Sequence, residues 1–410
     1  MSENLEIKPL IPESSTSEST TVEVVMNDLR DKSLRIPDYQ RDSDQWGEPT
    51  KSLLVESVIN NLSVPAFFFE VSIEGGVETN EVVDGQQRLT TLFDFYEDNF
   101  SLVDSQDAPY LSPNSVHYAG KKFKELPQAY QQAFKKYRIA VIKLRNIGEM
   151  RLEIFRRINQ GGTPLSGQDI RLAYYGEQSP SLALIRLAGI YDPDRQAAKR
   201  FLENARAQFQ LPYPWKAASA REAWRDWWEG KDISRGQTAS EMFLWSLIVT
   251  QVAQLDSLLQ NNAALQKLNA SFNRAIDDAL DTYCAQMRWQ DKNASPPPVL
   301  MTFQEMCDEF FPYFEQWIDL LLGQKGISLP VSKHRIVAAS IGAAYKAKVD
   351  PQTLTERQWT NIVEFVRRPQ EIAKNFDCEW PLSKGRWDGK RGYRTQMEAA
   401  HVVIRKITNG

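Results

Sequence analysis

The sequence of 410 residues has few of the residues that build metal centres and disulfides. Its three histidines lie far apart in unrelated contexts, at His117, His334 and His401. Its three cysteines never form the close pairs that a structural zinc site uses, standing at Cys284, Cys307 and Cys378. Unpaired cysteines fit a reducing cytoplasm. We therefore expect a cytoplasmic protein without a zinc site or a disulfide framework.

Long apolar runs and a strong excess of one charge are also missing. No apolar stretch approaches the roughly 20 residues of a membrane span, and the N-terminus lacks the layout of a signal peptide. The net charge of −4 argues against a protein that coats nucleic acid through overall charge, although local patches stay open. The hydrophobic content of 42% is ordinary for a globular protein, and the length predicts two or three packed units.

The pattern along the chain changes from mixed to helical. Residues 1–21 are too polar to bury anything, so a flexible tail is expected there. A hairpin around Gly75-Gly76, a strand over 138–144 and several helices follow, and from Leu182 the periodicity is almost entirely helical. The prolines at 296–298 interrupt it as an extended connector. These patterns predict an α+β chain with domains over 22–176, 177–295 and 299–410.

The most informative segment is 81–92. Glu81 to Val83 reads as a strand, Asp84-Gly85 breaks it, and apolar residues then return at helical spacing. The first N–H groups of a helix have no internal partner and carry the positive end of the dipole, so an anion can bind there. Gln86, Gln87 and Arg88 could add side-chain donors, and arginine can grip two phosphate oxygens. The alternative is that Asp-Gly is only a turn and Arg88 only a surface charge.

Two further segments join it in a resemblance. Residues 35–41 read RIPDYQR and precede Trp46, 84–92 read DGQQRLTTL, and 155–165 read FRRINQGGTPL. In this order they resemble the N-terminal domain of GmrSD-type modification-dependent restriction enzymes and of the phosphorothioate-sensing defence protein SspE. The match covers roughly 22–176. It implies a small mixed α/β fold like that of ParB and sulfiredoxin, whose glycine-to-arginine turn holds nucleotide phosphates, followed by a mainly α-helical region.

The resemblance also implies a function. Characterised relatives bind or hydrolyse nucleoside triphosphates and gate a nuclease, and many carry a C-terminal HNH-type nuclease domain. Such a site needs a general-base histidine and clustered metal ligands, which three scattered histidines do not supply. We therefore expect a stand-alone form that acts with a separately encoded nuclease or effector.

Hydrolysis of a triphosphate needs a metal and a group that orients water. Magnesium prefers oxygen ligands, and Asp84 is the carboxylate nearest the phosphate turn. Asn159 is the second candidate ligand, by analogy with ParB-like CTPases, although it could equally cap its helix before Gly161-Gly162. The predicted metal ligands are therefore Asp84 and Asn159, with Mg²⁺ as the cofactor.

Further nucleotide contacts are predicted from the first motif. Arg41 could supply a second positive charge to the phosphates, with Tyr39 and Gln40 beside it in the same cleft. Alternatively, Tyr39 packs and Arg41 pairs with a neighbouring aspartate. The predicted catalytic set is Asp84, Arg88 and Arg41, and the predicted nucleotide-binding set adds Tyr39, Gln40, Gly85, Gln86, Gln87 and Asn159. An arginine in an open cleft should contribute to ligand binding and little to stability.

A basic, aromatic segment near the C-terminus is the predicted DNA contact. Its cations are interleaved with tryptophan, tyrosine and glycine, and they are Lys384, Arg386, Lys390, Arg391 and Arg394. Cations can neutralise phosphates while aromatics stack on bases. Alternatively, the loop is solvated and its tryptophans anchor it to the core. A second candidate DNA surface is the tryptophan-rich stretch 215–228.

Three functions remain open from the sequence. The first is a nucleotide-hydrolysing switch subunit of an antiviral or restriction system. The second is a non-catalytic DNA-binding module of ParB type, and the third is an enzyme that itself nicks DNA. The preferred nucleotide, the trigger, the partner and any homo-oligomer are not fixed by the motifs.

Overall fold

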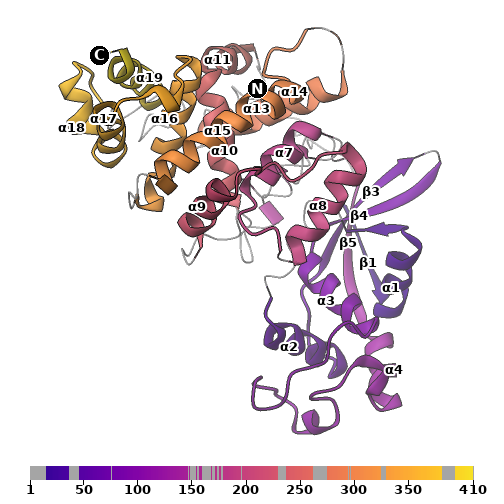
Figure 1. The fold of residues 1–410 in the computed structure, drawn as a ribbon. Helices are drawn as coiled ribbons and strands as arrows, with labels where there is room; N and C mark the ends of the chain where they lie inside the picture. The colour runs from indigo at the N-terminus through magenta and orange to yellow at the C-terminus, as the bar shows by residue number, and fades with distance from the viewer. Residues whose placement is uncertain are drawn as a thin grey trace, which may run out of the picture. The chain divides into compact units, whose positions relative to one another are not determined.

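The computed structural model describes residues 15–36, 46–74, 76–145, 147, 154, 157–158, 168, 171–172, 175–176, 179–194, 196–229, 237–261, 275–293, 295, 297–324, 329–380 and 393–409. The chain forms two compact units, Met1–Leu165 and Ser166–Gly410. The predicted α+β class is confirmed, because the first unit contains a mixed five-stranded sheet and the second is mainly helical (Figure 1). The domain limits predicted at 176 and 295 stay predictions.

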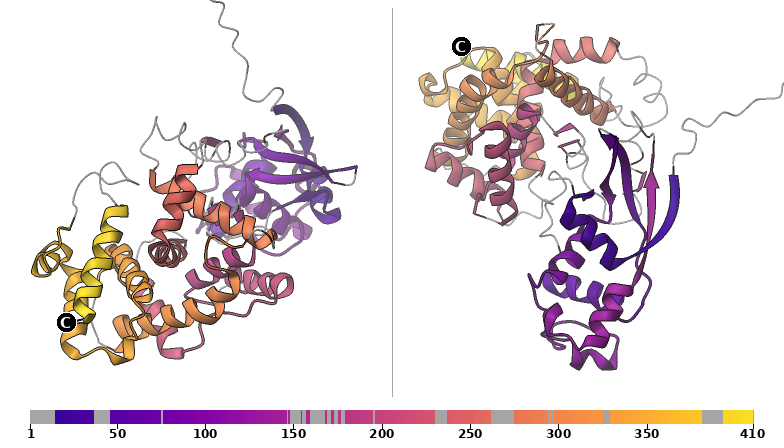
Figure 2. Two further views of the ribbon diagram at one scale, coloured as in Figure 1. Left: turned by 90° about the horizontal axis from the view of Figure 1, so that it is seen from above. Right: turned by 90° about the vertical axis from the view of Figure 1, so that its right-hand side faces the viewer.

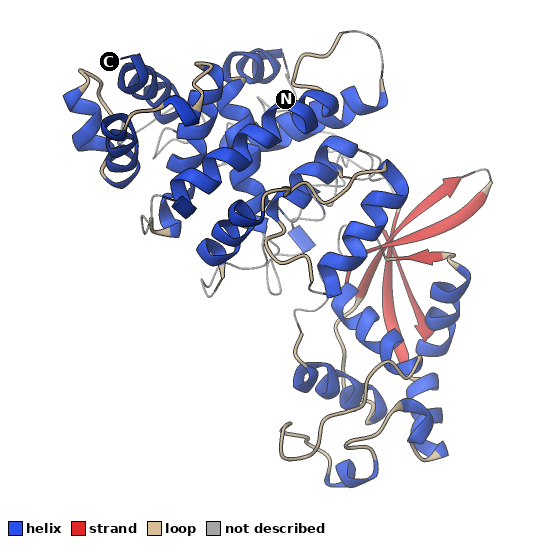
Figure 3. Cartoon of the chain, in the orientation of Figure 1, coloured by secondary structure: helices blue, strands red, loops and turns tan. Residues whose placement is uncertain are grey.

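The sheet of the first unit, red in Figure 3, has the strand order β1-β5-β3-β4-β2. Its strands are β1 (Ser15–Thr21), β2 (Leu34–Arg35), β3 (Phe67–Glu74), β4 (Val77–Asp84) and β5 (Arg138–Leu144). β3 and β4 form the predicted antiparallel hairpin, and β5 lies between β1 and β3. The short β2 runs parallel to β4, with Leu34 opposite Asn80. Both the hairpin and the strand over 138–144 were predictable from period-two patterns.

The expected flexible tail over 1–21 is wrong for its last seven residues. Ser15–Thr21 forms β1, which pairs antiparallel with β5 along its whole length, from Ser15 opposite Leu144 to Thr21 opposite Arg138. An edge strand is held by its backbone ladder and need not bury side chains. The polar composition that suggested a tail is therefore equally compatible with an edge strand. Residues 1–14 lie outside the described residues.

One hydrophobic core is shared by the sheet and four of the described helices of the first unit. The helices are α1 (Val22–Asp31), α2 (Glu48–Ile59), α3 (Gln86–Tyr96) and α4 (Gln128–Lys136). Thr21 caps α1, because its side chain accepts a hydrogen bond from Val24 N. The core combines side chains from the strands and the helices, among them Val25, Val55, Phe67, Val82, Leu92, Phe95, Phe134 and Val141.

A buried carboxylate fixes the long connection between α3 and α4. Glu56, on α2, is 2% exposed, and its Oε1 accepts hydrogen bonds from Leu111 N, Ser112 N and the hydroxyl of Tyr118 at 2.9, 3.0 and 2.8 Å. Burial and the Glu56 carboxylate raise the pKa of Tyr118 to about 12. A charged acceptor with three donors makes strong hydrogen bonds. The middle of this connection, from Leu111 to Tyr118, is therefore tied to α2.

The second unit is built of helices around a single hydrophobic core (Figures 1 and 2). Its described helices include α7 (Pro180–Gly189), α8 (Gln196–Phe209), α9 (Ala218–Trp228), α10 (Gln237–Thr250), α11 (Val252–Asn261), α13 (Ala275–Lys292), α14 (Phe303–Glu305), α15 (Phe311–Ile318), α16 (His334–Lys346), α17 (Glu356–Arg367), α18 (Pro369–Asn375) and α19 (Tyr393–Asn409). π-helical turns at Met306–Phe310 and Asp319–Gln324 flank α15.

Helix α10 lies in the middle of this core. Its central side chains, including Phe243, Leu247 and Ile248, are fully buried. None of the described helices is by itself long and apolar enough to cross a membrane. The pair Thr238–Thr250 and Val252–Gln260, bent by 88°, passes that test together by length and composition. Full burial of an apolar helix inside a protein core explains the same composition.

Candidate functional site

The junction between β4 and α3 has the predicted strand, glycine and helix. β4 ends at Asp84, Gly85 has φ 93° and ψ 9°, and α3 begins at Gln86. A Cβ atom at Gly85 would lie 2.5 Å from Phe67 Cδ1. Both the left-handed backbone and the contact with this ring require glycine. The strand end and the helix start are thereby held close to each other.

The N-terminus of α3 carries no side-chain cap. Gly85 offers no side-chain acceptor, and the hydrogen bond from Leu89 N to Gly85 O, 2.8 Å, begins the helical ladder. The N–H groups of the first turn therefore have no acceptor inside the helix, and the dipole of this 11-residue helix adds to their positive potential. An anion such as a phosphate fits this environment.

Arg88 lies against the junction with its guanidinium turned inward. Nη2 donates to Asp84 Oδ2 at 3.0 Å and to Ala66 O at 3.3 Å, and Nη1 donates to Pro65 O. The guanidinium carbon lies 4.7 Å from the centre of the Phe67 ring. The side chain is only 13% exposed. Burial lowers the pKa of Arg88 from its ordinary value, and the charge of Asp84 opposes this shift.

This geometry corrects two sequence-based interpretations of Arg88. It is not a surface charge, and it does not stand in an open cleft. Its side chain bonds two carbonyl groups that precede β3, so it ties the start of β3 to the turn after β4. No residue pattern indicates Pro65 and Ala66 as partners of Arg88, because backbone acceptors carry no side-chain signature. The aromatic run at 67–69 suggested only a buried strand.

Asp84 offers one carboxylate to the site. Its side chain is 29% exposed, and one oxygen pairs with Arg88. Among the described residues no group of three or more His, Cys, Asp or Glu is arranged to hold a metal ion. Magnesium keeps several waters and is commonly bound by one or two carboxylates together with substrate phosphates. The junction therefore suits a magnesium ion that arrives with a nucleotide better than a metal site made by protein ligands alone.

The two glutamines occupy the first turn of α3. Gln86 Nε2 is buried and has no hydrogen-bond partner among the described residues. The carbonyl of Gln87 accepts a hydrogen bond from Thr91 Oγ1 at 2.7 Å. Since a buried amide nitrogen without a partner is costly, Gln86 retains a donor for an acceptor at this turn.

The first motif begins at the same edge of the sheet. β2 is parallel to β4, with Arg35 opposite Glu81, so the C-terminal ends of both strands point the same way. Asp84, Gly85, Gln86 and Arg88 are brought together at that edge. The other predicted nucleotide contacts, Tyr39, Gln40, Arg41 and Asn159, lie outside the described residues.

The predicted DNA surface is described at one residue only. Arg394 lies on α19, where its Nη2 is 2.6 Å from Asp256 Oδ2 and 2.9 Å from Glu398 Oε1. Lys384, Arg386, Lys390 and Arg391 lie outside the described residues. In the alternative DNA surface at 215–228 the tryptophans are buried in the core, namely Trp215, Trp224, Trp227 and Trp228. Buried rings cannot stack on bases.

The first unit thus presents an α+β fold with a junction between a strand and an uncapped helix. Residues 22–176 match the family model described as the N-terminal domain of the GmrSD restriction endonuclease. The match falls on the segment in which the three motifs predicted this resemblance. No curated protein and no solved structure matches the chain.

Proposed function

We propose that this protein is a nucleotide-binding and nucleotide-hydrolysing switch of a restriction-type defence system. The observation that carries the proposal is the β4–α3 junction, where Gly85 and an uncapped helix N-terminus lie beside Asp84 and Arg88. The family match supports the restriction context, since the family's description names a restriction endonuclease. The proposed cofactor is Mg²⁺, and the proposed partner is a separate nuclease or effector in the cytoplasm.

In the proposed chemistry, a few groups at the β4–α3 junction contact the nucleotide and its magnesium ion. The N–H groups at the start of α3 bind phosphate oxygens, and Gln86 adds a side-chain donor. A bound magnesium ion would neutralise phosphate charge, with Asp84 and Asn159 as its proposed protein ligands. Because Asp84 also pairs with Arg88, a cation at Asp84 competes with the guanidinium. Incoming phosphates relieve that competition by giving Arg88 another anion to face.

Arg88→Ala is expected to abolish nucleotide binding or turnover. One lost charge-assisted contact corresponds to about 1.5–3 kcal/mol of binding. Because Arg88 also bonds Pro65 O and Ala66 O, we further expect a loss of stability of about 1–3 kcal/mol. Phosphate release from ATP, GTP, CTP and UTP and urea unfolding of the same samples measure the two effects.

Arg88→Lys separates the two roles, since it keeps the charge but loses the fork that reaches two carbonyls and a carboxylate. If both variants bind and hydrolyse every nucleotide like the parent protein, the phosphate assignment is wrong. Asp84→Ala should keep part of the binding and lose the magnesium-dependent step. Equal turnover by that variant with and without magnesium would leave Asp84 a structural partner of Arg88.

DNA contact stays a separate prediction. Arg394 is engaged by two carboxylates, so it could contact phosphate only by exchanging those partners. If the five predicted cations contact duplex DNA, affinity should fall with salt at a log–log slope of roughly −4 to −5. A DNA affinity that does not change with salt would exclude DNA contact by these cations and would leave the nucleotide proposal intact.

A further inference from the structure

One exposed segment of the first unit leads from α2 into β3. Residues 62–66 form neither helix nor strand, and β3 begins directly after them. Leu62 is 39% exposed, and Ser63 and Pro65 are exposed as well. Near the start of the segment, Leu62 O accepts a hydrogen bond from the hydroxyl of Tyr137 at 2.6 Å. We call residues 62–66 the connecting segment.

Arg88 holds the other end of the connecting segment. Its guanidinium donates to Pro65 O and to Ala66 O, the latter at 3.3 Å. The same guanidinium pairs with Asp84 at 3.0 Å and lies 4.7 Å from the centre of the Phe67 ring. One side chain therefore joins the candidate nucleotide site to the connecting segment.

This arrangement depends on the carboxylate of Asp84. Arg88 is only 13% exposed, and Asp84 is its counter-ion among the described residues. When Asp84 coordinates magnesium, the guanidinium keeps two neutral carbonyl partners but shares its counter-ion in a largely buried place, which is unfavourable. A phosphate is a better partner than a carbonyl, because it carries the opposite charge and can accept two parallel N–H bonds from arginine. Arg88 belongs to the first turn of α3, where that phosphate would bind.

We propose that Arg88 is a latch on the connecting segment and that binding of a magnesium–nucleotide complex opens it. The guanidinium moves from Pro65 O and Ala66 O to the phosphate, and the two carbonyls turn to water. The connecting segment then loosens while the start of α3 becomes more ordered. The inference rests on the proposed nucleotide function and names the regulation of that site. The exposed connecting segment is the surface on which a partner protein detects the bound nucleotide.

Hydrogen exchange of the full chain tests the proposal. ATP, GTP, CTP and UTP are each added with MgCl₂, and exchange is followed in peptides covering 84–92 and 62–67. Nucleotide should slow exchange over 84–92 and speed it over 62–67, by about two- to tenfold for each hydrogen bond that the segment loses. The opposite signs are diagnostic, because a ligand that only stabilised the first unit would slow exchange in both peptides.

Arg88→Lys is the test variant, because lysine keeps the charge but cannot reach both carbonyls and Asp84 together. Without nucleotide, its exchange over 62–67 should already match that of the nucleotide-bound parent protein, and nucleotide should not raise it further. Tyr137→Phe is the matched control, since it removes another side-chain hydrogen bond to the connecting segment, the one at Leu62 O. Its exchange over 62–67 should start higher than in the parent protein and still rise with nucleotide.

The outcomes separate the latch from the nucleotide site. Slower exchange over 84–92 without acceleration over 62–67 in the parent protein would overturn the latch and leave nucleotide binding in place. Slow exchange over 62–67 in Arg88→Lys without nucleotide would overturn it as well, since the guanidinium would then not hold the segment. Loss of the response in Tyr137→Phe would have the same meaning, because any loosening of the segment would abolish it. If neither peptide responds to any of the four nucleotides, the nucleotide function itself is wrong and the latch falls with it.

Discussion

Two glycines of the first unit, one in the β3–β4 hairpin and one at the β4–α3 junction, differ in what surrounds them. Gly76 and Gly85 both have positive φ, 84° and 93°, but a Cβ at Gly76 would meet nothing within 4 Å, whereas one at Gly85 would meet the Phe67 ring at 2.5 Å. Both substitutions by alanine strain the backbone, by about 1–2 kcal/mol. Only the second also displaces a buried ring.

We therefore expect Gly85→Ala to destabilise the first unit by about 1–3 kcal/mol more than Gly76→Ala does. Urea unfolding of the two variants measures the difference. Equal losses would mean that Phe67 yields without cost and that the close approach at the junction is not needed.

The cysteines should differ in reactivity according to their burial. Burial raises the pKa of Cys284 to about 12 and that of Cys307 to about 11, while Cys378 is partly exposed and its pKa is raised less. Because the thiolate is the reacting form, native Cys284 should resist a thiol reagent at about pH 8. Mass spectrometry of the labelled chain should find Cys378 modified first and Cys284 last. In urea all three should react alike, and early labelling of native Cys284 would contradict its burial.

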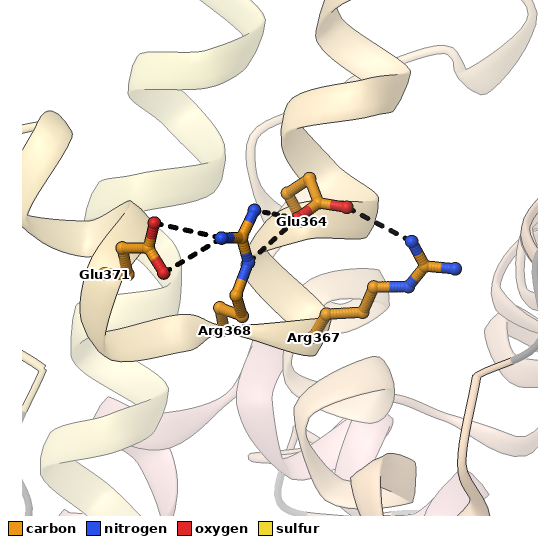
Figure 4. Close-up of polar contacts among 4 residues, drawn as sticks. All are labelled: Glu364, Arg367, Arg368 and Glu371. Atoms are coloured by element: carbon orange, nitrogen blue, oxygen red, sulfur yellow. Dashed lines mark hydrogen bonds and ion pairs between the residues drawn. The ribbon is translucent and has the colours of Figure 1, made fainter.

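An exposed corner joins α17 and α18 at the element scale (Figure 4). Arg368 lies between the two helices, as the C-cap of α17 and the N-cap of α18. Its side chain donates hydrogen bonds to Glu364 through Nε at 3.0 Å and to Glu371 through Nη1 at 3.0 and 3.1 Å. Arg367 also donates to Glu364, at 3.2 Å. The hydrogen bond from Arg368 lowers the pKa of Glu364 below its ordinary value. Since the corner is exposed, its contribution to stability should be small and sensitive to salt.

The pH dependence of this contribution has a definite sign. A carboxylate whose pKa is lower in the folded state stabilises the fold above its unfolded pKa, and the effect disappears as pH falls through the folded value. The melting temperature of the parent protein should therefore exceed that of Glu364→Gln at about pH 7, with the gap closing below about pH 4. A gap that persists at low pH, or that survives about 1 M salt, would assign the effect to packing.

Sequence patterns predicted some elements well for physical reasons. The sequence spacing of Thr355 and Gln358 is that of a capping box, and both reciprocal hydrogen bonds are present at the start of α17. Phe310, Phe314 and Trp317 recur at the spacing of one helical face, and all three are buried. β1 was missed because an edge strand is held by backbone hydrogen bonds, which residues of any type can make. The backbone partners of Arg88, Pro65 and Ala66, were missed because they lie more than 20 residues away and no local period connects them.

The two units have separate hydrophobic cores, so at the scale of the whole molecule unfolding should not be a single step. We expect calorimetry to show two transitions. Glu56→Ala should shift only the transition of the first unit, since it leaves three donors of the loop without their acceptor. Arg171→Met should shift only the transition of the second unit, since Arg171 is 1% exposed and pairs with Asp281 there. In each variant the free energy of unfolding should fall by at most about 3–5 kcal/mol.

A single cooperative transition, shifted by either variant, would show that the units unfold together. The sequence alone could not predict where the division falls, because Gln168 and Arg171 lie within the family match at 22–176 and yet belong to the compact unit Ser166–Gly410.

The place of β5 in the sheet also affects synthesis of the chain. β5 pairs with β1 on one side and with β3 on the other, although 138–144 is translated last of the five strands. Until the ribosome has released that strand, β1 has no neighbour and β3 has one open edge. The nascent first unit therefore exposes pairing edges while most of its residues have already emerged. Early recruitment of chaperones, or slow passage of the ribosome beyond 144, would protect the nascent chain at this stage.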